Sequence, residues 1–168
     1  MMILLTFAHR NEAQCFFEHF TLKLSADIPQ LWIGEEIYII ITGEGQFESL
    51  NSVSSVLAAS SSQITRVVNL GIAGCLNKQF KNDDLISIRT SYLILENTPQ
   101  FKSFPLKTIE GLKVADVLTS SKRIINTEER AKLSPMADIV DRELWSIGFA
   151  CHKANVSLSA IKVISDTT

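Results

Sequence analysis

Two carboxylates stand where buried strands would end, and their type and position make them the best candidates for chemistry. Asp166 follows the apolar run 158–164, and Glu12 follows the apolar run 3–7. A carboxyl group beside a buried strand is partly shielded from water, so Asp166 can serve as a general acid while Glu12 serves as a base. A structural role is the alternative, because acidic residues at strand ends often cap helices or occupy solvated turns.

Other catalytic signatures are incomplete. Gly43-Glu44-Gly45 supplies two glycines of a dinucleotide fingerprint, but Glu48 occupies the third position, where a carboxylate is unfavourable beside a pyrophosphate. A pair of turn glycines is the simpler interpretation. The three histidines lack metal-ligand spacing, and the Gly-x-Ser-x-Gly pattern of serine hydrolases does not occur. We therefore expect neither a metal nor a cofactor.

The stretch 67–75 is the element around which the other predicted elements are arranged. Its β-branched start without alternation indicates a strand covered on both faces, and Gly71 and Gly74 predict that this strand runs into a loop. Other apolar runs and stripes predict strands at 3–7, 32–33, 37–42, 85–88, 92–95, 114–118 and 158–164, and helices at 12–20, 47–60, 126–134 and 140–154. The segment 97–105, with two prolines, is predicted to be a loop.

Strands that alternate with helices predict the α/β class, as a single domain over residues 1–168 with a mixed central sheet flanked by helices. In such sheets ligands bind at the carboxyl ends of the strands. That rule brings together Glu12, 43–46, 71–75, 120–123 and Asp166.

Composition excludes several classes of partner. The net charge is −2 and no run of Lys or Arg occurs, so we expect no nucleic acid and no membrane as partner. The chain is 46% hydrophobic and 20% charged, which is enough to form a core. Three cysteines without a Cys-x-x-Cys pair predict reduced thiols and a cytoplasmic location.

Five segments, in order along the chain, are similar to motifs of one enzyme family. Lys162-Val163-Ile164-Ser165-Asp166, for example, resembles the family's Arg-Ala-Ile-Ser-Asp, and the other segments are 8–12, 42–46, 69–74 and 140–143. On these segments the chain resembles the nucleoside phosphorylase and nucleosidase superfamily, especially the 5′-methylthioadenosine/S-adenosylhomocysteine nucleosidases. Each motif alone is weak, whereas five in the right order and rough spacing are fairly specific.

The resemblance implies hydrolysis of the N-glycosidic bond of a purine nucleoside, a small-molecule partner of the methylthioadenosine or S-adenosylhomocysteine type. Asp166 would be the general acid on the base, Glu12 would activate water, and Glu143 would bind the ribose hydroxyls. A ribosyl bond breaks through an oxocarbenium-like state, which such a pair of acids would serve. The other substrate-binding positions that the resemblance assigns are Arg142, Gly71, Ala73, Gly74, Ile124 and Ser165.

Alternatives to this activity stay open. Phosphorylases of the family carry an arginine where this chain has the neutral Asn69, so a hydrolase is favoured. A futalosine hydrolase-like enzyme is a close variant. A catalytically impaired nucleoside-binding or structural relative is the third interpretation, because Arg142 and Arg123 stand where the family has an apolar sugar contact and a stacking phenylalanine, and because the chain ends soon after Asp166. Ile72 also replaces a serine that lies near the water in the family.

The chain ends two residues after Asp166, which predicts that it lacks the C-terminal helix of the family. Without that helix an apolar face of the sheet would be uncovered. Either activity is impaired, or a second copy covers the face. We expect a homodimer, to which Trp145 and Phe149 contribute from outside the main stripe of their helix.

Overall fold

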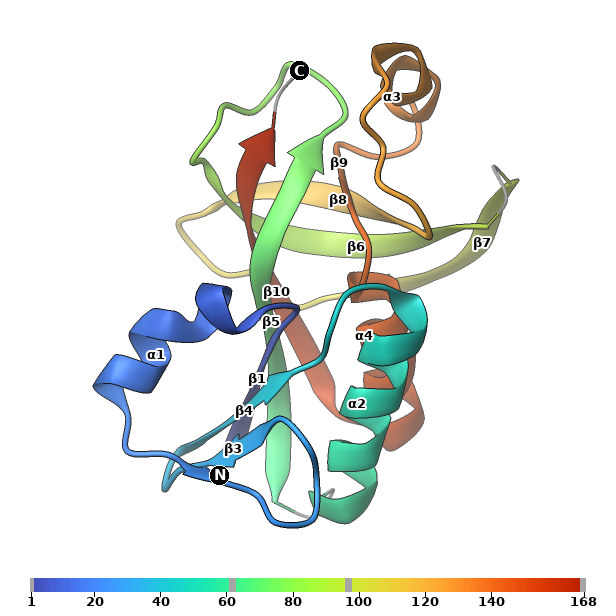
Figure 1. Ribbon diagram of the computed structural model, residues 1–168. Helices are drawn as coiled ribbons and strands as arrows, with labels where there is room; N and C mark the ends of the chain where they lie inside the picture. Colours follow the sequence, from blue (N-terminus) through green and yellow to red (C-terminus); the bar gives the residue numbers. More distant parts are fainter. Residues whose placement is uncertain (1, 61–62, 96–97, 167–168) are drawn as a thin grey trace.

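A computed structural model describes the backbone of residues 2–60, 63–95 and 98–166, and the side chains of these residues except 95, 98–102 and 166. Figure 1 shows the elements, which are β1 (Met2–Phe7), the 3-10 helix η1 (Arg10–Ala13), α1 (Gln14–His19), β2 (Lys23–Leu24), β3 (Leu31–Ile33), β4 (Ile37–Ile41), α2 (Gln46–Ser60), β5 (Ile64–Cys75), β6 (Leu85–Leu95), β7 (Thr98–Pro105), β8 (Lys113–Ser120), α3 (Thr127–Leu133), β9 (Ile139–Asp141), α4 (Leu144–Ala154) and β10 (Ser157–Asp166).

The strands form one mixed sheet in the order β10-β6-β8-β9-β5-β1-β4-β3-β2, with β7 paired to β6. Because β10 also pairs with β5, the strands β5, β10, β6, β8 and β9 close into a ring. The strands β1, β4, β3 and β2 extend from this ring as an open sheet. The strands β1, β4, β5 and β10 run parallel, so their carboxyl ends meet at one edge. The predicted mixed α/β sheet is confirmed.

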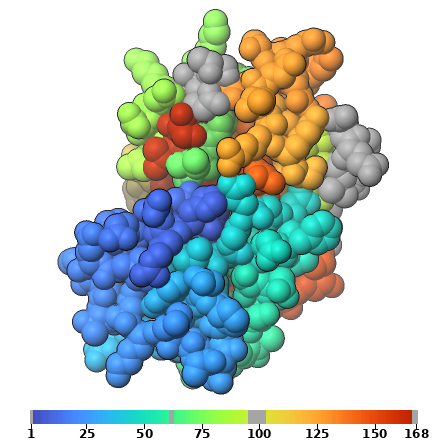
Figure 2. Space-filling model, in the orientation of Figure 1, coloured from blue at the N-terminus to red at the C-terminus, as the bar shows by residue number. Residues whose placement is uncertain are grey.

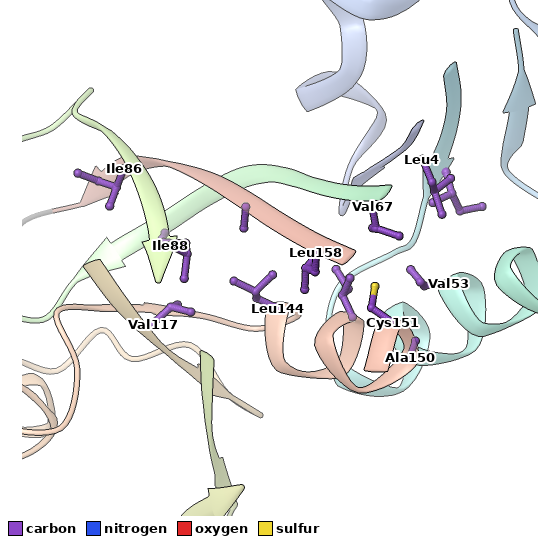
Figure 3. Packing of buried hydrophobic residues seen from close by; sticks show 14 of the residues in the cluster. Leu4, Val53, Val67, Ile86, Ile88, Val117, Leu144, Ala150, Cys151 and Leu158 are labelled. Carbon is purple, nitrogen blue, oxygen red and sulfur yellow. The ribbon is translucent and has the colours of Figure 1, made fainter. Parts of the chain in front are cut away.

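Helices cover both faces of the open sheet, as the unbroken apolar runs of β1 and β4 require. Leu4 and Val67 pack on one face against Val53 of α2 and Cys151 of α4, as Figure 3 shows. Phe7 lies on the opposite face, where the aromatic side chains of α1 pack against it. Alternate residues of one strand therefore supply two separate cores.

Two predicted loops are strands. The strand β5 does not end before its glycines but continues through Gly71 and Gly74 to Cys75, because β10 pairs with it along this length. The segment 98–105 forms β7, which pairs on one side with β6 and therefore tolerates Pro99 and Pro105, which lack an N–H donor. Asn97, the first residue of that predicted loop, lies outside the described residues.

Smaller differences concern where elements begin. The expected strands 85–88 and 92–95 are one bulged strand, β6. Val140 does not belong to α4 but lies in β9, opposite Gly74 and Leu118. The helix cap predicted at Asn126 is confirmed, since its Oδ1 accepts a hydrogen bond from the Glu128 N–H at 2.8 Å.

Among the helices of the described ranges, none has both the length and the hydrophobicity needed to cross a membrane.

Candidate active site

A cavity of about 250 Å³ opens at the edge where β1, β5 and β10 end. Figure 2 shows blue, cyan, green, orange and red segments, far apart in sequence, meeting on this face. The cavity is lined by Ala8, His9, Glu12, Glu44, Asn69, Leu70, Gly71, Ile72, Ala73, Gly74, Lys122, Arg123, Ile124, Val140, Asp141, Arg142, Glu143, Lys162 and Ser165. It therefore collects residues from the ends of β5, β9 and β10 and from the loops that follow β1, β4, β8 and β9. A site at the carboxyl ends of parallel strands is what the topology of the sheet predicts.

Glu12 and Lys162 converge on the backbone of Gly71. The Glu12 carboxylate is oriented by the His9 N–H, which donates to its Oε2 at 3.0 Å. Lys162 lies in β10 directly opposite Gly71 in the register of β5. A Cβ at Gly71 would lie 3.5 Å from Glu12 Oε1 and 3.8 Å from Lys162 Nζ. The missing side chain therefore leaves room for a small molecule between a carboxylate and an ammonium group.

A buried ion pair supports this arrangement. Lys162 Nζ lies 2.8 Å from Asp141 Oδ2, with the two side chains 2% and 0% exposed. Asp141 also accepts hydrogen bonds from Thr119 Oγ1 at 2.6 Å and from the Leu144 N–H at 3.0 Å. Desolvation alone would lower the pKa of Lys162, but the charges of Asp141 and Glu143 outweigh it and raise that pKa. Lys162 therefore remains an ammonium group inside the protein.

Glu143 completes what we call the inner cluster, which consists of Glu12, Asp141, Glu143 and Lys162. Glu143 Oε1 accepts a hydrogen bond from the Gly45 N–H at 2.7 Å. Gly45 has a φ of +92°, a conformation that a residue with a Cβ rarely adopts. Burial, followed by the charge of Asp141, raises the pKa of Glu143 above its ordinary value. Such a carboxyl group can bind hydroxyl groups of a ligand.

A second group of charges surrounds the mouth of the cavity, and we call it the rim cluster: His9, Glu44, Arg123 and Arg142. Glu44 Oε1 lies 2.9 Å from His9 Nε2 and accepts a hydrogen bond from Arg123 Nη2 at 2.7 Å, while Oε2 accepts one from Arg142 Nη1. The hydrogen bonds with His9 and Arg123 lower the pKa of Glu44. Four separate loops are thus joined through one carboxylate.

The cavity brings together the predicted Glu12, Glu143, Arg142, Gly71, Ala73, Gly74, Ile124 and Ser165. Asp166 is the last residue of β10 and pairs with Gly74, but its side chain lies outside the described residues.

Sequence reasoning assigned no role in the site to Lys162 or Asp141, and it placed Glu44 at the binding edge only as part of the segment 43–46. Lys162 could have been identified because it lies within the apolar run 158–164, and an ammonium group in a buried strand requires a partner. No local signal identified Asp141 as that partner or Glu44 as the centre of a cluster.

No family model and no curated protein matches the sequence. Solved structures do match. The native futalosine hydrolase of Helicobacter pylori has 18% identity and a TM-score of 0.82 over 99% of this chain and 84% of its own. The 5′-methylthioadenosine/S-adenosylhomocysteine nucleosidase of Neisseria meningitidis, solved in complex with methylthio-immucillin-A, has 18% identity and a TM-score of 0.82 over 98% of this chain and 85% of its own. The corresponding nucleosidase of Campylobacter jejuni has 15% identity and a TM-score of 0.82 over 99% of this chain and 85% of its own. The chain has the nucleosidase fold. The superfamily fold that the five motifs predicted is therefore confirmed.

Proposed function

We propose that this chain hydrolyses the N-glycosidic bond of a purine nucleoside. The observation that carries the proposal is the convergence of Glu12 Oε1 and Lys162 Nζ on Gly71 inside the cavity. A water molecule between them would be held by an acceptor and a donor and would lose its proton to Glu12. The nucleosidase fold and the similar structure solved with methylthio-immucillin-A support the same class of substrate.

In the proposed reaction, the bond from C1′ to the base nitrogen breaks and its electron pair leaves with the base. Asp166 donates the proton that neutralises the base, while Glu143 accepts hydrogen bonds from the ribose hydroxyls. The water oxygen bonds to C1′ and its proton goes to Glu12. The carboxylates of the inner cluster stabilise the positive charge that develops on the sugar.

Water is favoured over phosphate as the nucleophile. Asn69 is 3% exposed, and its Nδ2 donates to Thr6 Oγ1 at 3.0 Å, so it stands as a neutral structural residue. Lys162 is neutralised by Asp141 at 2.8 Å. A phosphate dianion would need charge-assisted donors that the inner cluster, with more carboxylates than cations, does not supply.

Methylthioadenosine and futalosine are the two substrates to test first. The purified chain is incubated with each, with and without phosphate, and free base is measured. We expect base release without phosphate, and a loss of that release in Asp166→Asn. Absence of release from both nucleosides, with nucleoside binding unchanged in Asp166→Asn, contradicts the enzymatic function, and release that strictly requires phosphate contradicts hydrolysis.

We also propose a homodimer. Trp145 and Phe149 of α4 are half-buried and stack with ring centroids 5.7 Å apart, so the part of their surface that stays exposed is a candidate contact. Sedimentation equilibrium tests it: we expect a dimer that Trp145→Ala weakens, and a monomeric wild-type protein contradicts the proposal.

A further inference from the structure

The charges that line the cavity are separated into two regions of opposite sign. The inner cluster contains three carboxylates and one ammonium group. The rim cluster contains two guanidinium groups and an imidazole around one carboxylate. A ligand that spans the cavity therefore meets a negative potential at its inner end and a positive potential at its outer end.

The two arginines of the rim cluster have N–H donors that the Glu44 carboxylate does not engage. Arg142 donates through Nη1 to Glu44 and through Nη2 to the Ser121 carbonyl at the long distance of 3.4 Å, while its Nε is buried and has no partner among the described residues. Arg123 is 70% exposed and is bound to the same carboxylate. Guanidinium groups bind carboxylates and phosphates through paired donors, and one carboxylate cannot satisfy both groups.

From this arrangement we infer that the rim cluster recognises an anionic group of the substrate, a carboxylate or a phosphate, through Arg142 and Arg123. The inference rests on the proposed function and defines its substrate class as a nucleoside that carries an acidic substituent. Glu44 binds both arginines through one carboxylate, and the incoming anion takes over the N–H donors that Glu44 leaves unused or releases. The alternative is that the cluster serves only to hold four loops together.

Three nucleosides distinguish these alternatives: neutral 5′-methylthioadenosine, adenosine 5′-monophosphate and adenosine-5′-carboxylic acid. We expect kcat/KM for one of the anions to exceed that for the neutral nucleoside by about 10-fold or more, because charge-assisted hydrogen bonds are stronger than neutral ones. Comparison of the two anions shows whether the group is a phosphate or a carboxylate. Raising the salt concentration should reduce the preference.

Arg142→Gln and Arg123→Gln should each lower the ratio of anionic to neutral kcat/KM by about 10-fold. Arg66→Gln is the matched control, since Arg66 is exposed and does not line the cavity, so it should leave the ratio unchanged. If Arg142→Gln fails to fold, the exposed Arg123 provides the second variant.

Equal hydrolysis of neutral and anionic nucleosides, with a ratio that neither arginine variant changes, overturns the inference and leaves the proposed function intact. If no nucleoside is hydrolysed, the proposed function fails, and titration calorimetry with adenosine 5′-monophosphate, adenosine-5′-carboxylic acid and adenosine still tests the rim. Tighter binding of either anion, abolished in Arg142→Gln, supports the rim site, and equal binding of all three overturns it.

Discussion

Lys162 and Asp141 are paired with almost no exposed surface, whereas the four side chains of the rim cluster are between 29% and 70% exposed. Both regions pair carboxylates with basic groups, but water screens only the rim. Removing one partner of a buried pair leaves a charge without solvent, while a surface pair contributes little to stability. The inner cluster is therefore suited to hold fixed positions, and the rim cluster to exchange partners.

The largest effect is expected from Lys162→Met, which leaves Asp141 buried without its ammonium partner. We expect a loss of about 3–5 kcal/mol in the free energy of unfolding, measured by urea denaturation. Lys132→Met is the control, because Lys132 pairs with Glu128 at 71% and 76% exposure and should cost less than about 0.5 kcal/mol. Similar losses in both variants would abolish the distinction between buried and exposed pairs.

Gly71→Ala tests the space between Glu12 and Lys162. The new Cβ would make ordinary van der Waals contacts of 3.5–3.9 Å, so the fold should be retained. The methyl group would displace the proposed water, and we expect the rate of base release to fall by about 10- to 100-fold while the unfolding temperature is nearly unchanged. Full activity in this variant would show that the reacting water lies elsewhere.

Glu143→Gln should weaken nucleoside binding and, at alkaline pH, raise the stability of the fold. Burial and the neighbouring Asp141 raise the pKa of Glu143, so the folded state holds this proton at pH values where the unfolded state has released it. Stability therefore falls as the pH rises from the ordinary pKa of a glutamate through the raised pKa.

The glutamine variant should consequently unfold at a higher temperature than the wild type at about pH 8 and at the same temperature near pH 4, while its nucleoside affinity falls. Thermal unfolding at both pH values is the measurement. A destabilised variant at the higher pH would mean that the attraction to Lys162 outweighs burial.

The smallest effect is expected at the rim. Glu44→Gln should lower the free energy of unfolding by no more than about 1 kcal/mol, and salt should reduce the difference further. Urea denaturation at low and high salt measures both quantities. A loss comparable to that of Lys162→Met would show that the rim cluster mainly stabilises the fold by holding its loops together and does not exchange partners with a ligand.

Local patterns predicted most elements but not the contacts that join them. The apolar runs of β1 and β4 and the cap at Asn126 are local features, and they were predicted correctly. The continuation of β5 through Gly71 depends on pairing with β10, which is distant in sequence. Asp141 pairs with Lys162 across two strands that are far apart in sequence, and Glu44 pairs with arginines from other loops. Spacing along the chain therefore could not identify these ion pairs.

The most direct test of the account is the rate of base release in a single turnover by Glu12→Gln, compared with Glu18→Gln. Glu18 is an exposed glutamate that accepts a hydrogen bond from Gln14, so its variant should retain the wild-type rate. If Glu12 activates the water, Glu12→Gln should be slower by about 100- to 10,000-fold with nucleoside affinity preserved. A Glu12→Gln protein that releases base at the wild-type rate would show that Glu12 does not activate the water.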